Sequence, residues 1–211
     1  AKAAQGGASG ITALCNLAMG ELNLGFRNSQ ASAQARLVGT FEVANNSTGN
    51  TSSDLSALQN NTAVQAERDR LNADIVSLFI EDNQTGTLGV AYGSSTLSPS
   101  SEMQCWNVVQ LQAVTGSFHS FAHETGHNMG CMHNKDQTNA GNGPFTYSHG
   151  WRWAGNDGNR YRSLLSYQSP SFSNEPRIIH FSNRPTETIP DWCHSISPFK
   201  ATQDWLAENE C

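Results

Sequence analysis

The eleven residues HETGHNMGCMH, at positions 123–133, are the most informative stretch of the chain. His123 and His127 are four residues apart, so on a helix their imidazoles project from the same face, one turn apart. Gly130 can adopt a positive φ, which would end the helix and turn the chain so that His133 reaches the same point. Three imidazoles with one open position are typical of a catalytic zinc. The spacing therefore predicts one zinc ion bound by these three histidines.

Glu124 follows the first of these histidines, where its carboxylate would lie near the metal without binding it. Zinc lowers the pKa of a bound water towards about 7. We expect Glu124 to accept a proton from that water and to return it to the leaving amine. The metal would also polarise the scissile carbonyl and stabilise the oxyanion. This combination predicts a zinc-dependent endopeptidase with protein or peptide substrates.

A second interpretation is a non-catalytic, zinc-stabilised protein-binding module that retains the motif as a scaffold. Glu124 argues against it, because a structural zinc site has no use for a base beside the water. Digestion of casein or gelatin with and without a zinc chelator would separate the two interpretations.

Composition excludes other classes of protein. The chain has 211 residues, enough for one domain with a proper core. A net charge of −6 with only 12 Lys and Arg residues argues against a nucleic-acid partner, which would need a basic surface to meet phosphates. A hydrophobic content of 37% is too high for a disordered chain. No apolar run approaches the roughly 18 residues of a membrane span, so we also expect no membrane partner.

The start of the chain and its five cysteines indicate the cellular compartment in which the protein works. The sequence begins at Ala1 and shows no signal segment, which predicts a processed chain. Five cysteines suit an oxidising compartment, so we expect a secreted, extracellular protein. Because five is odd, at most two intramolecular disulfides can form. The candidate pairs are Cys193 with Cys211 and Cys105 with Cys131, and the candidate odd thiol, buried and unreactive, is Cys15.

Apolar spacing predicts an α/β first half and a loop-rich second half. We treat residues 1–211 as a single domain, with an N-terminal subdomain of about 1–133, a C-terminal subdomain of about 134–211 and the active-site cleft between them. Thr62 and Gln65 form a candidate capping box, residues 45–53 a surface loop, and residues 134–160 an irregular region. The predicted helices span residues 11–26, 62–73 and 117–129, with a closing helix after Pro198, and the predicted strands span residues 36–43, 74–81, 87–93 and 105–112.

With its glycine and third histidine, the zinc motif resembles that of the metzincin zinc endopeptidases. The segment YRSLLSY at 161–167 matches their Met-containing turn, and residues 147–151 and 177–183 are similar to bacterial secreted reprolysin-like and astacin-like metalloproteases. The resemblance runs from about residue 2 to 185. It implies a twisted mixed β-sheet with long helices in the N-terminal subdomain. It also implies a loop-rich C-terminal subdomain ending in a helix, a monomer, and an inhibitory N-terminal propeptide before maturation.

The same resemblance implies that residues 87–92 form an antiparallel edge strand along which the substrate peptide lies. The residues concerned are Leu88, Gly89, Val90, Ala91 and Tyr92.

The chain departs from the family pattern at three places. Leu165 occupies the position of the turn methionine, which packs beneath the zinc ligands, and a Leu of similar volume implies a modest cost. Asn134 follows the third histidine, where reprolysins usually carry Asp and astacins Glu, so the subfamily stays open. Relatives usually have a strand before the first helix, whereas this chain begins with AKAAQGG.

The remaining candidates stay open or are structural. Tyr167 is either a fifth zinc ligand or oxyanion donor, as in astacin- and serralysin-type sites, or a buried aromatic near the metal. His119 is expected in the first turn of the helix, away from the zinc. Calcium could bind in the loops 136–142 and 155–158, although no EF-hand register is present. The histidines treated as structural are His149, His180 and His194.

Overall fold

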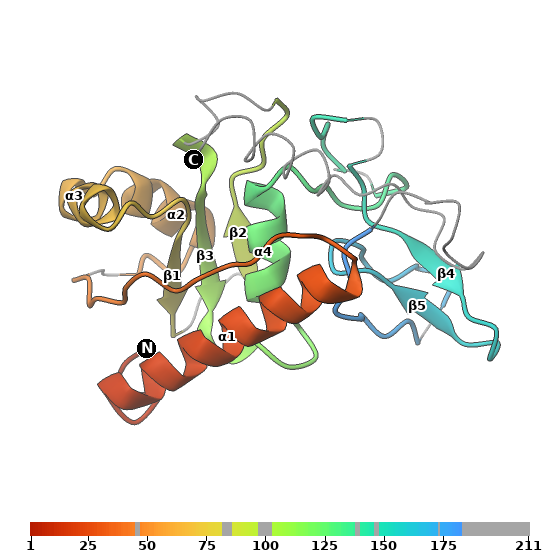
Figure 1. Cartoon of the computed structure of the whole chain (residues 1–211), viewed down its shortest axis with the longest axis horizontal. Coiled ribbons are helices and arrows are strands. Elements are labelled where there is room, and N and C mark those ends of the chain that lie inside the picture. Colours follow the sequence, from red (N-terminus) through yellow and green to blue (C-terminus); the bar gives the residue numbers. More distant parts are fainter. Residues whose placement is uncertain are drawn as a thin grey trace.

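The computed structural model describes residues 1–44, 47–81, 86–96, 103–137, 140–145, 148–172 and 174–182. Helices cover a small mixed sheet, and a separate two-stranded sheet lies beyond helix α4 (Figure 1). The helices are α1 (Ala8–Asn28), α2 (Thr51–Gln59), α3 (Thr62–Leu71) and α4 (Ser120–Asn128), with a 3₁₀ turn η2 (Leu111–Ala113). The strands are β1 (Val76–Ile80), β2 (Gly89–Ala91), β3 (Trp106–Gln110), β4 (Arg152–Ala154) and β5 (Arg160–Arg162).

The three-stranded sheet has the order β1-β3-β2. Strand β1 runs parallel to β3, and β2 runs antiparallel to β3 at the edge. This confirms the predicted mixed sheet and α/β class. It also places the expected edge strand where the resemblance implied, with Val90 opposite Val108.

All five residues of strand β3 are buried. Since successive side chains point to opposite faces of a strand, β3 contributes to a core on each face of the sheet. On one face, Val109 joins a core formed with α1, α4 and the later residues Leu164, Leu165 and Phe181. On the other face, Trp106 and Val108 pack with residues of α2, α3 and β1. Helix α4, which carries the first two histidines of the motif, is therefore held between the sheet and the C-terminal segments (Figure 1).

Asn128, at the end of α4, ties this helix to the sheet. Its buried side-chain Nδ2 donates to the carbonyls of Tyr92, Gln104 and Trp106 at 3.0, 2.8 and 2.9 Å. Its Oδ1 accepts a hydrogen bond from the side-chain amide of Asn107 at 2.8 Å. Buried backbone carbonyls need hydrogen-bond donors, so the side-chain amide of Asn128 fixes the distance between α4 and strands β2 and β3.

The strand predicted at residues 36–43 is wrong. Residues 31–44 carry no regular structure and lie beside α1. The side-chain amide of Asn23 donates to the Ala35 carbonyl at 2.9 Å and accepts from the Ala35 N–H at 2.7 Å. A helix side chain thereby supplies the pair of hydrogen bonds that a neighbouring strand would give.

Helix α2 was not predicted, and the predicted capping of α3 is corrected. The loop predicted at 45–53 contains the beginning of α2, because the Asn50 side chain accepts from the N–H groups of Ser52 and Ser53. Helix α3 is capped by Asn61 rather than by a Thr62–Gln65 box. Asparagine is among the best N-cap residues, and Asn61 precedes the predicted start at Thr62 by one residue.

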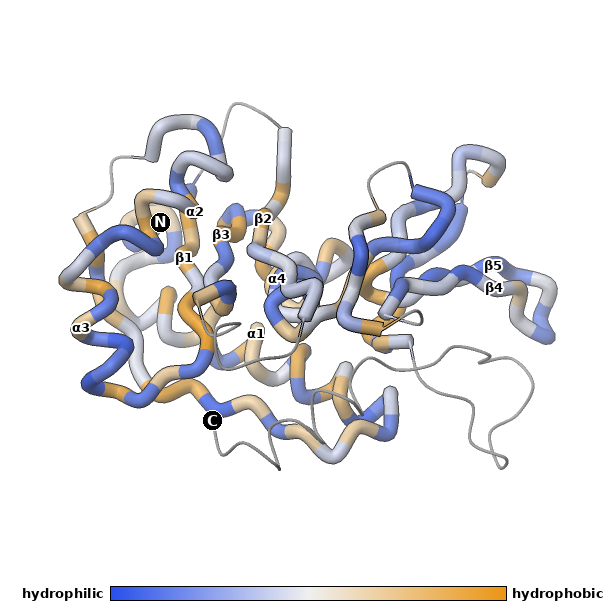
Figure 2. The backbone as a smooth tube through the Cα atoms, turned by 90° about the horizontal axis from the view of Figure 1, so that it is seen from above, coloured by the Kyte–Doolittle hydropathy of each residue, from blue (hydrophilic) through white to orange (hydrophobic). Residues whose placement is uncertain are grey.

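Residues 134–160, predicted to be irregular, contain strand β4, which pairs antiparallel with β5. Figure 2 shows mostly hydrophilic residues along this hairpin, and for that reason it lacks a clear strand pattern. The predicted closing helix, His194, Cys193 and Cys211 lie outside the described residues. Within the described residues, no helix is both long and apolar enough to cross a bilayer.

The expected Cys105–Cys131 disulfide is not formed, and the part of the chain that the structure describes contains no disulfide. Cys131 is buried in the core beside α4, where burial raises the pKa of its thiol. Cys15 is half-buried on α1, and burial raises its pKa as well. Both cysteines therefore act as small apolar groups.

Candidate metal centre

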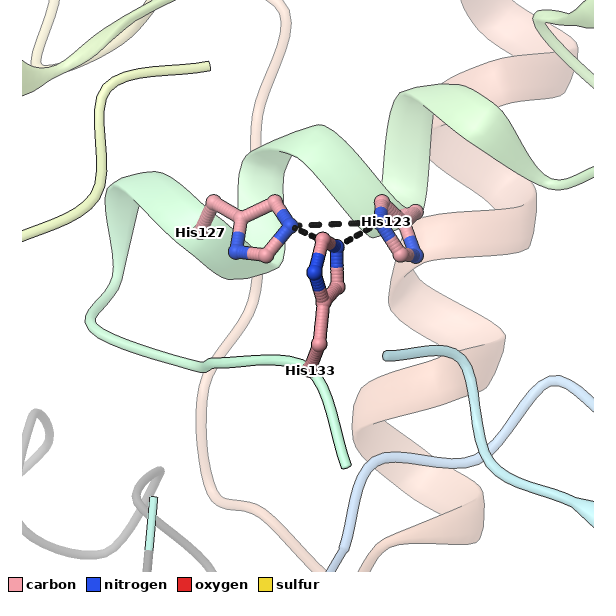
Figure 3. A group of neighbouring side chains, drawn as sticks. All are labelled: His123, His127 and His133. Carbon is pink, nitrogen blue, oxygen red and sulfur yellow. Dashed lines mark hydrogen bonds between the residues drawn. The ribbon is translucent and has the colours of Figure 1, made fainter. Parts of the chain in front are cut away.

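The three histidines of the motif meet at one point (Figure 3). His123 and His127 project from the same face of α4, with their Nε2 atoms 3.2 Å apart. The helix ends in a Schellman motif, in which Cys131 N–H donates to the Gly126 carbonyl and Gly130 N–H to the His127 carbonyl. Gly130 has the positive φ, 85°, that was expected of it. The chain then turns back and brings His133 to the other two rings.

The geometry of the three rings fits a zinc ion. The Nε2 atom of His133 lies 3.3 Å from that of His123 and 3.0 Å from that of His127. Zinc–nitrogen bonds of about 2.0–2.1 Å in a tetrahedral site separate the nitrogens by about 3.3–3.4 Å. The observed separations are close to these values. Within the described residues, this is the only group of three or more potential ligand side chains that converge in this way.

Hydrogen bonds at the opposite ring nitrogens fix the protonation of two rings. His123 Nδ1 lies 2.6 Å from the Leu164 carbonyl, and His127 Nδ1 lies 2.7 Å from the Cys131 carbonyl. A carbonyl can only accept, so each Nδ1 carries the proton and each Nε2 presents a lone pair. The two Nε2 lone pairs thus face each other without a proton to share. A bound cation satisfies this arrangement.

Burial keeps these rings neutral, as metal ligands must be. It lowers the pKa of His123 well below 6.5, and the neighbouring His127, Arg177 and His133 lower it further. It lowers the pKa of His127 to about 3, with His133 adding to the effect. The residues present therefore match the donor set of a zinc site in charge as well as in geometry.

Glu124 is buried beside the histidines and faces the edge strand. The residue is only 6% exposed, and burial raises the pKa of its carboxyl group from 4.5 to about 8, against the opposing charge of Arg177. A Cβ atom built on Gly89 of β2 would lie 2.7 Å from Glu124 Oε1. The carboxylate thus occupies the space that any side chain at position 89 would need.

The segment matched to the family turn lies beneath α4. The Leu164 carbonyl accepts from His123, as described above, and Leu165 is 2% exposed in the core. A Cβ atom on Gly126 would lie 2.8 Å from Leu165 Cδ2, so this leucine packs directly under the helix between the first two histidines. The turn position therefore holds a close-packed apolar side chain under the candidate ligands.

Tyr167 stands beside the histidine cluster. Its ring centroid is 4.5 Å from that of His133 and 6.1 Å from that of His123, both edge-on. The side chain is 41% exposed, so it is not the buried aromatic of the second interpretation. Partial burial and the charge of Glu124 raise the pKa of its phenol, so it remains protonated and able to donate.

Asn134, which departs from the family pattern, positions this tyrosine. Its Oδ1 accepts from the Tyr167 N–H at 2.8 Å and from the Ser166 hydroxyl at 3.3 Å. Asn134 thus links the residue after the third histidine to the turn segment. A carboxylate oxygen could accept the same bonds, which explains how Asp or Glu can occupy this position in relatives.

The other histidines and the calcium loops do not add ligands. His119 precedes α4 in a left-handed conformation and pairs with Glu21 at 2.9 Å, away from the cluster. His149 Nδ1 bonds to the His133 carbonyl at 2.8 Å, and His180 is buried. In the two candidate calcium loops, Asp136 pairs with Arg152, and Asp157 with Asn159 and Tyr161. The structure gives calcium no support.

Arg177 was missed as a functional candidate by sequence reasoning, which used it only as part of a family match. Its Nη1 donates to the Phe118 carbonyl at 2.6 Å, and its Nε is buried without a partner. Burial lowers the pKa of this guanidinium to about 10 while the charges of Tyr167 and Glu124 act to raise it. An arginine in a segment without periodic pattern gives no local signal that would identify it.

Comparisons with known proteins agree with this geometry. A family model described as Reprolysin_5, metallo-peptidase family M12, matches residues 2–182. A protein of Stenotrophomonas maltophilia named peptidyl-Asp metalloendopeptidase is 30% identical over 189 residues, covering 87% of this chain and 42% of its own length. A protein of the same name from Xanthomonas campestris pv. campestris is 29% identical over 179 residues, covering 82% of this chain and 39% of its own length. The chain thus spans about two fifths of the length of these relatives.

A solved structure described as "Structure of a chaperone-substrate complex" shares the fold. It superposes with a TM-score of 0.64 at 22% identity over 93% of this chain and 34% of that one.

We predict that the protein binds one zinc ion and that His133→Ala weakens binding by more than about 100-fold, because one of three ligands is lost. Titration of the metal-free protein with zinc in a calorimeter measures this. Zinc should also raise the melting temperature of the wild type, since only the folded state brings the ligands together. The control is His119→Asn, which tolerates the left-handed backbone and should bind zinc normally. Equal affinity in His133→Ala would contradict the site.

Proposed function

Because this chain belongs to metallo-peptidase family M12, we propose that it is a zinc-dependent endopeptidase with His123, His127 and His133 as the metal ligands. One observation carries the proposal. Three imidazoles converge with Nε2 separations of 3.0–3.3 Å, and the buried Glu124 carboxylate lies between them and an edge strand. A structural zinc site would not need a buried carboxylate that is not a ligand.

Zinc, when bound, supplies a Lewis acid that makes water nucleophilic at neutral pH and polarises a carbonyl. Glu124 accepts the proton of the attacking water and delivers it to the leaving amine. Its position favours this role, because the buried side chain lies beside the histidines and its Oε1 lies 2.7 Å from a Cβ built on Gly89 of the edge strand. Tyr167, held beside His133 by Asn134, donates a hydrogen bond to the developing oxyanion.

Strand β2 binds the substrate peptide. Leu88 and Tyr92 use their backbone groups to pair with Gln110 and Trp106 of β3. Backbone groups alternate in direction along an antiparallel strand, so those of Gly89 and Ala91 point away from β3. An extended peptide can add to this edge through main-chain hydrogen bonds. At Gly89 the bound peptide would lie beside Glu124.

We extend the proposal to substrates that contain aspartate. The similar proteins from Stenotrophomonas maltophilia and Xanthomonas campestris are both named peptidyl-Asp metalloendopeptidases. This chain matches them over most of its own length, including the metal centre.

We also propose that the protein acts outside the cell and that a propeptide inhibits it before maturation. A protein-degrading enzyme endangers its host cell, and only 12 Lys and Arg residues leave few cleavage sites for trypsin-like proteases outside it. Immunoblots of cells and culture medium from the producing organism test this. A product confined to the cells would contradict secretion, and a single form of unchanged mass in both fractions would contradict removal of a propeptide.

We predict that Glu124→Ala lowers casein hydrolysis by about 10³-fold while zinc binding and melting temperature are retained, because the general base is lost and the ligands are not. A fluorogenic casein assay and metal analysis of the same sample measure both. The control is Glu42→Ala, which removes an exposed carboxylate far along the chain. Full activity in Glu124→Ala would reject the mechanism. A wild type that binds zinc yet cleaves neither casein nor gelatin would favour the non-catalytic binding module.

We predict that Gly89→Ala lowers kcat by about 10- to 100-fold with little change in melting temperature. The new methyl group would meet Glu124 Oε1 and Cγ at 2.7 and 2.8 Å, and the carboxylate side chain must move away. A displacement of a catalytic group by about 1 Å costs rates of this order. Gly20→Ala is the control, because a Cβ there meets nothing within 4 Å and α1 is exposed at that position. Unchanged kcat in Gly89→Ala would contradict the placement of Glu124.

A further inference from the structure

We infer that Arg177 selects acidic substrates by pairing with the carboxylate of a substrate side chain next to the cleaved bond. The inference rests on the proposed peptidase function. It goes beyond that function by assigning the recognition of aspartate to one residue of this chain.

Backbone pairing holds Arg177 at the metal centre. Ile178 N–H donates to the Arg162 carbonyl at 3.0 Å, and Leu164 N–H donates to the His180 carbonyl at 2.9 Å. The segment 177–182 therefore runs beside residues 162–164. The Leu164 carbonyl in turn holds His123, so Arg177 belongs to the strand-like segment that lies next to the ligand support.

The side chain of Arg177 reaches the start of the active-site helix. Its Nη1 donates to the Phe118 carbonyl at 2.6 Å, and Phe118 lies two residues before the first residue of α4. Its charge is near enough to Glu124 and to Tyr167 to affect both. Its charge also acts on His123 and His127, so the guanidinium lies close to the histidine cluster.

Arg177 lacks the carboxylate partner that three other arginines of the described chain have. Arg160 pairs with Glu175, Arg152 with Asp136 and Arg70 with Glu67. Arg177 makes no ion pair within the described residues, and its Nε is buried without a hydrogen-bond partner. A half-buried guanidinium with unused N–H groups is costly, and an anionic ligand would relieve that cost.

The neighbouring Arg162 is not available for the same role. Its Nε donates to the Glu175 carbonyl at 2.7 Å and its Nη1 to the Ser166 carbonyl at 2.8 Å. These two hydrogen bonds occupy the Arg162 guanidinium, which thereby holds the turn segment 161–167 in place. Arg177 offers a planar fork that fits a carboxylate through two parallel hydrogen bonds, a geometry that a neutral amide cannot match.

Arg177 could instead serve only to support the site. In that case its loss would slow the cleavage of every peptide alike, because Glu124 or the Phe118 loop would be disturbed. Recognition of a carboxylate makes a different demand. It requires that loss of Arg177 lowers kcat/KM for acidic peptides and leaves the ratio of kcat/KM between neutral peptides unchanged.

The test compares peptides that are identical except for Asp, Asn or Leu at one position. For the zinc-loaded wild type we expect kcat/KM to favour Asp over Asn by about 100-fold, the range for a charge-assisted pair in a partly desolvated site. Arg177→Gln should bring that ratio near 1 and leave the Asn-to-Leu ratio in place. Arg177→Lys should retain part of the preference, since it keeps the charge but not the fork. The control is Arg36→Gln, which removes an exposed charge and should keep the wild-type ratio.

Binding gives a second measurement that does not depend on turnover. In a Glu124→Ala background, fluorescence anisotropy with a labelled Asp peptide should show that adding Arg177→Gln raises Kd at least about tenfold, with no such change for the Asn peptide. Circular dichroism melting shows whether each variant is folded. If Arg177→Gln does not fold, the comparison of Arg177→Lys with the wild type decides the case.

The outcomes separate this inference from the proposed function. A wild type that cleaves all peptides without preference for Asp overturns the role of Arg177 but leaves the peptidase intact. Retention of the Asp preference in Arg177→Gln, or an equal loss for all peptides, also overturns it. A zinc-loaded wild type that cleaves no peptide rejects the proposed function itself, and the binding measurement then decides whether Arg177 still recognises the carboxylate.

Discussion

The site depends on the hydrogen bond from His123 Nδ1 to the Leu164 carbonyl, at 2.6 Å, which connects helix α4 to the turn segment 161–167. On one side it fixes the tautomer of a ligand on α4, so that Nε2 presents its lone pair to the metal. On the other side it holds the segment that places Leu165 under the helix and Tyr167 beside His133. Since residues 177–182 pair with that same segment, Arg177 also takes its position from this contact.

The sheet supplies the second constraint, which is the distance between α4 and its edge. Asn128 sets that distance by bonding to carbonyls at Tyr92, Gln104 and Trp106. The helix then lies so close to β2 that Glu124 fills the space over Gly89. A general base must lie within hydrogen-bond reach of its proton, so in the proposed mechanism this close approach between helix and edge strand would bring Glu124 and the peptide together. Only glycine permits that approach.

Sequence reasoning was reliable where the signal is local. The histidine spacing, the turn at Gly130, the periodicity of α1 and the start signal before α4 depend on near neighbours, and the structure agrees with them. The strand expected at 36–43 was wrong because a distant side chain, Asn23, satisfies that backbone. The position of Arg177 beside the metal centre could not be predicted, since it arises from pairing between segments whose partners no sequence pattern identifies.

The proposed selection of acidic peptides by an acidic protein requires a local cation rather than an overall field. The chain has a net charge of −6, which repels an acidic peptide at long range. At physiological salt, charges more than about 8–10 Å apart are largely screened, so this repulsion is weak. At short range, inside a partly buried site, the lower effective dielectric strengthens a single ion pair. One unpaired guanidinium at the metal centre can therefore determine selectivity, although the rest of the surface carries the opposite sign.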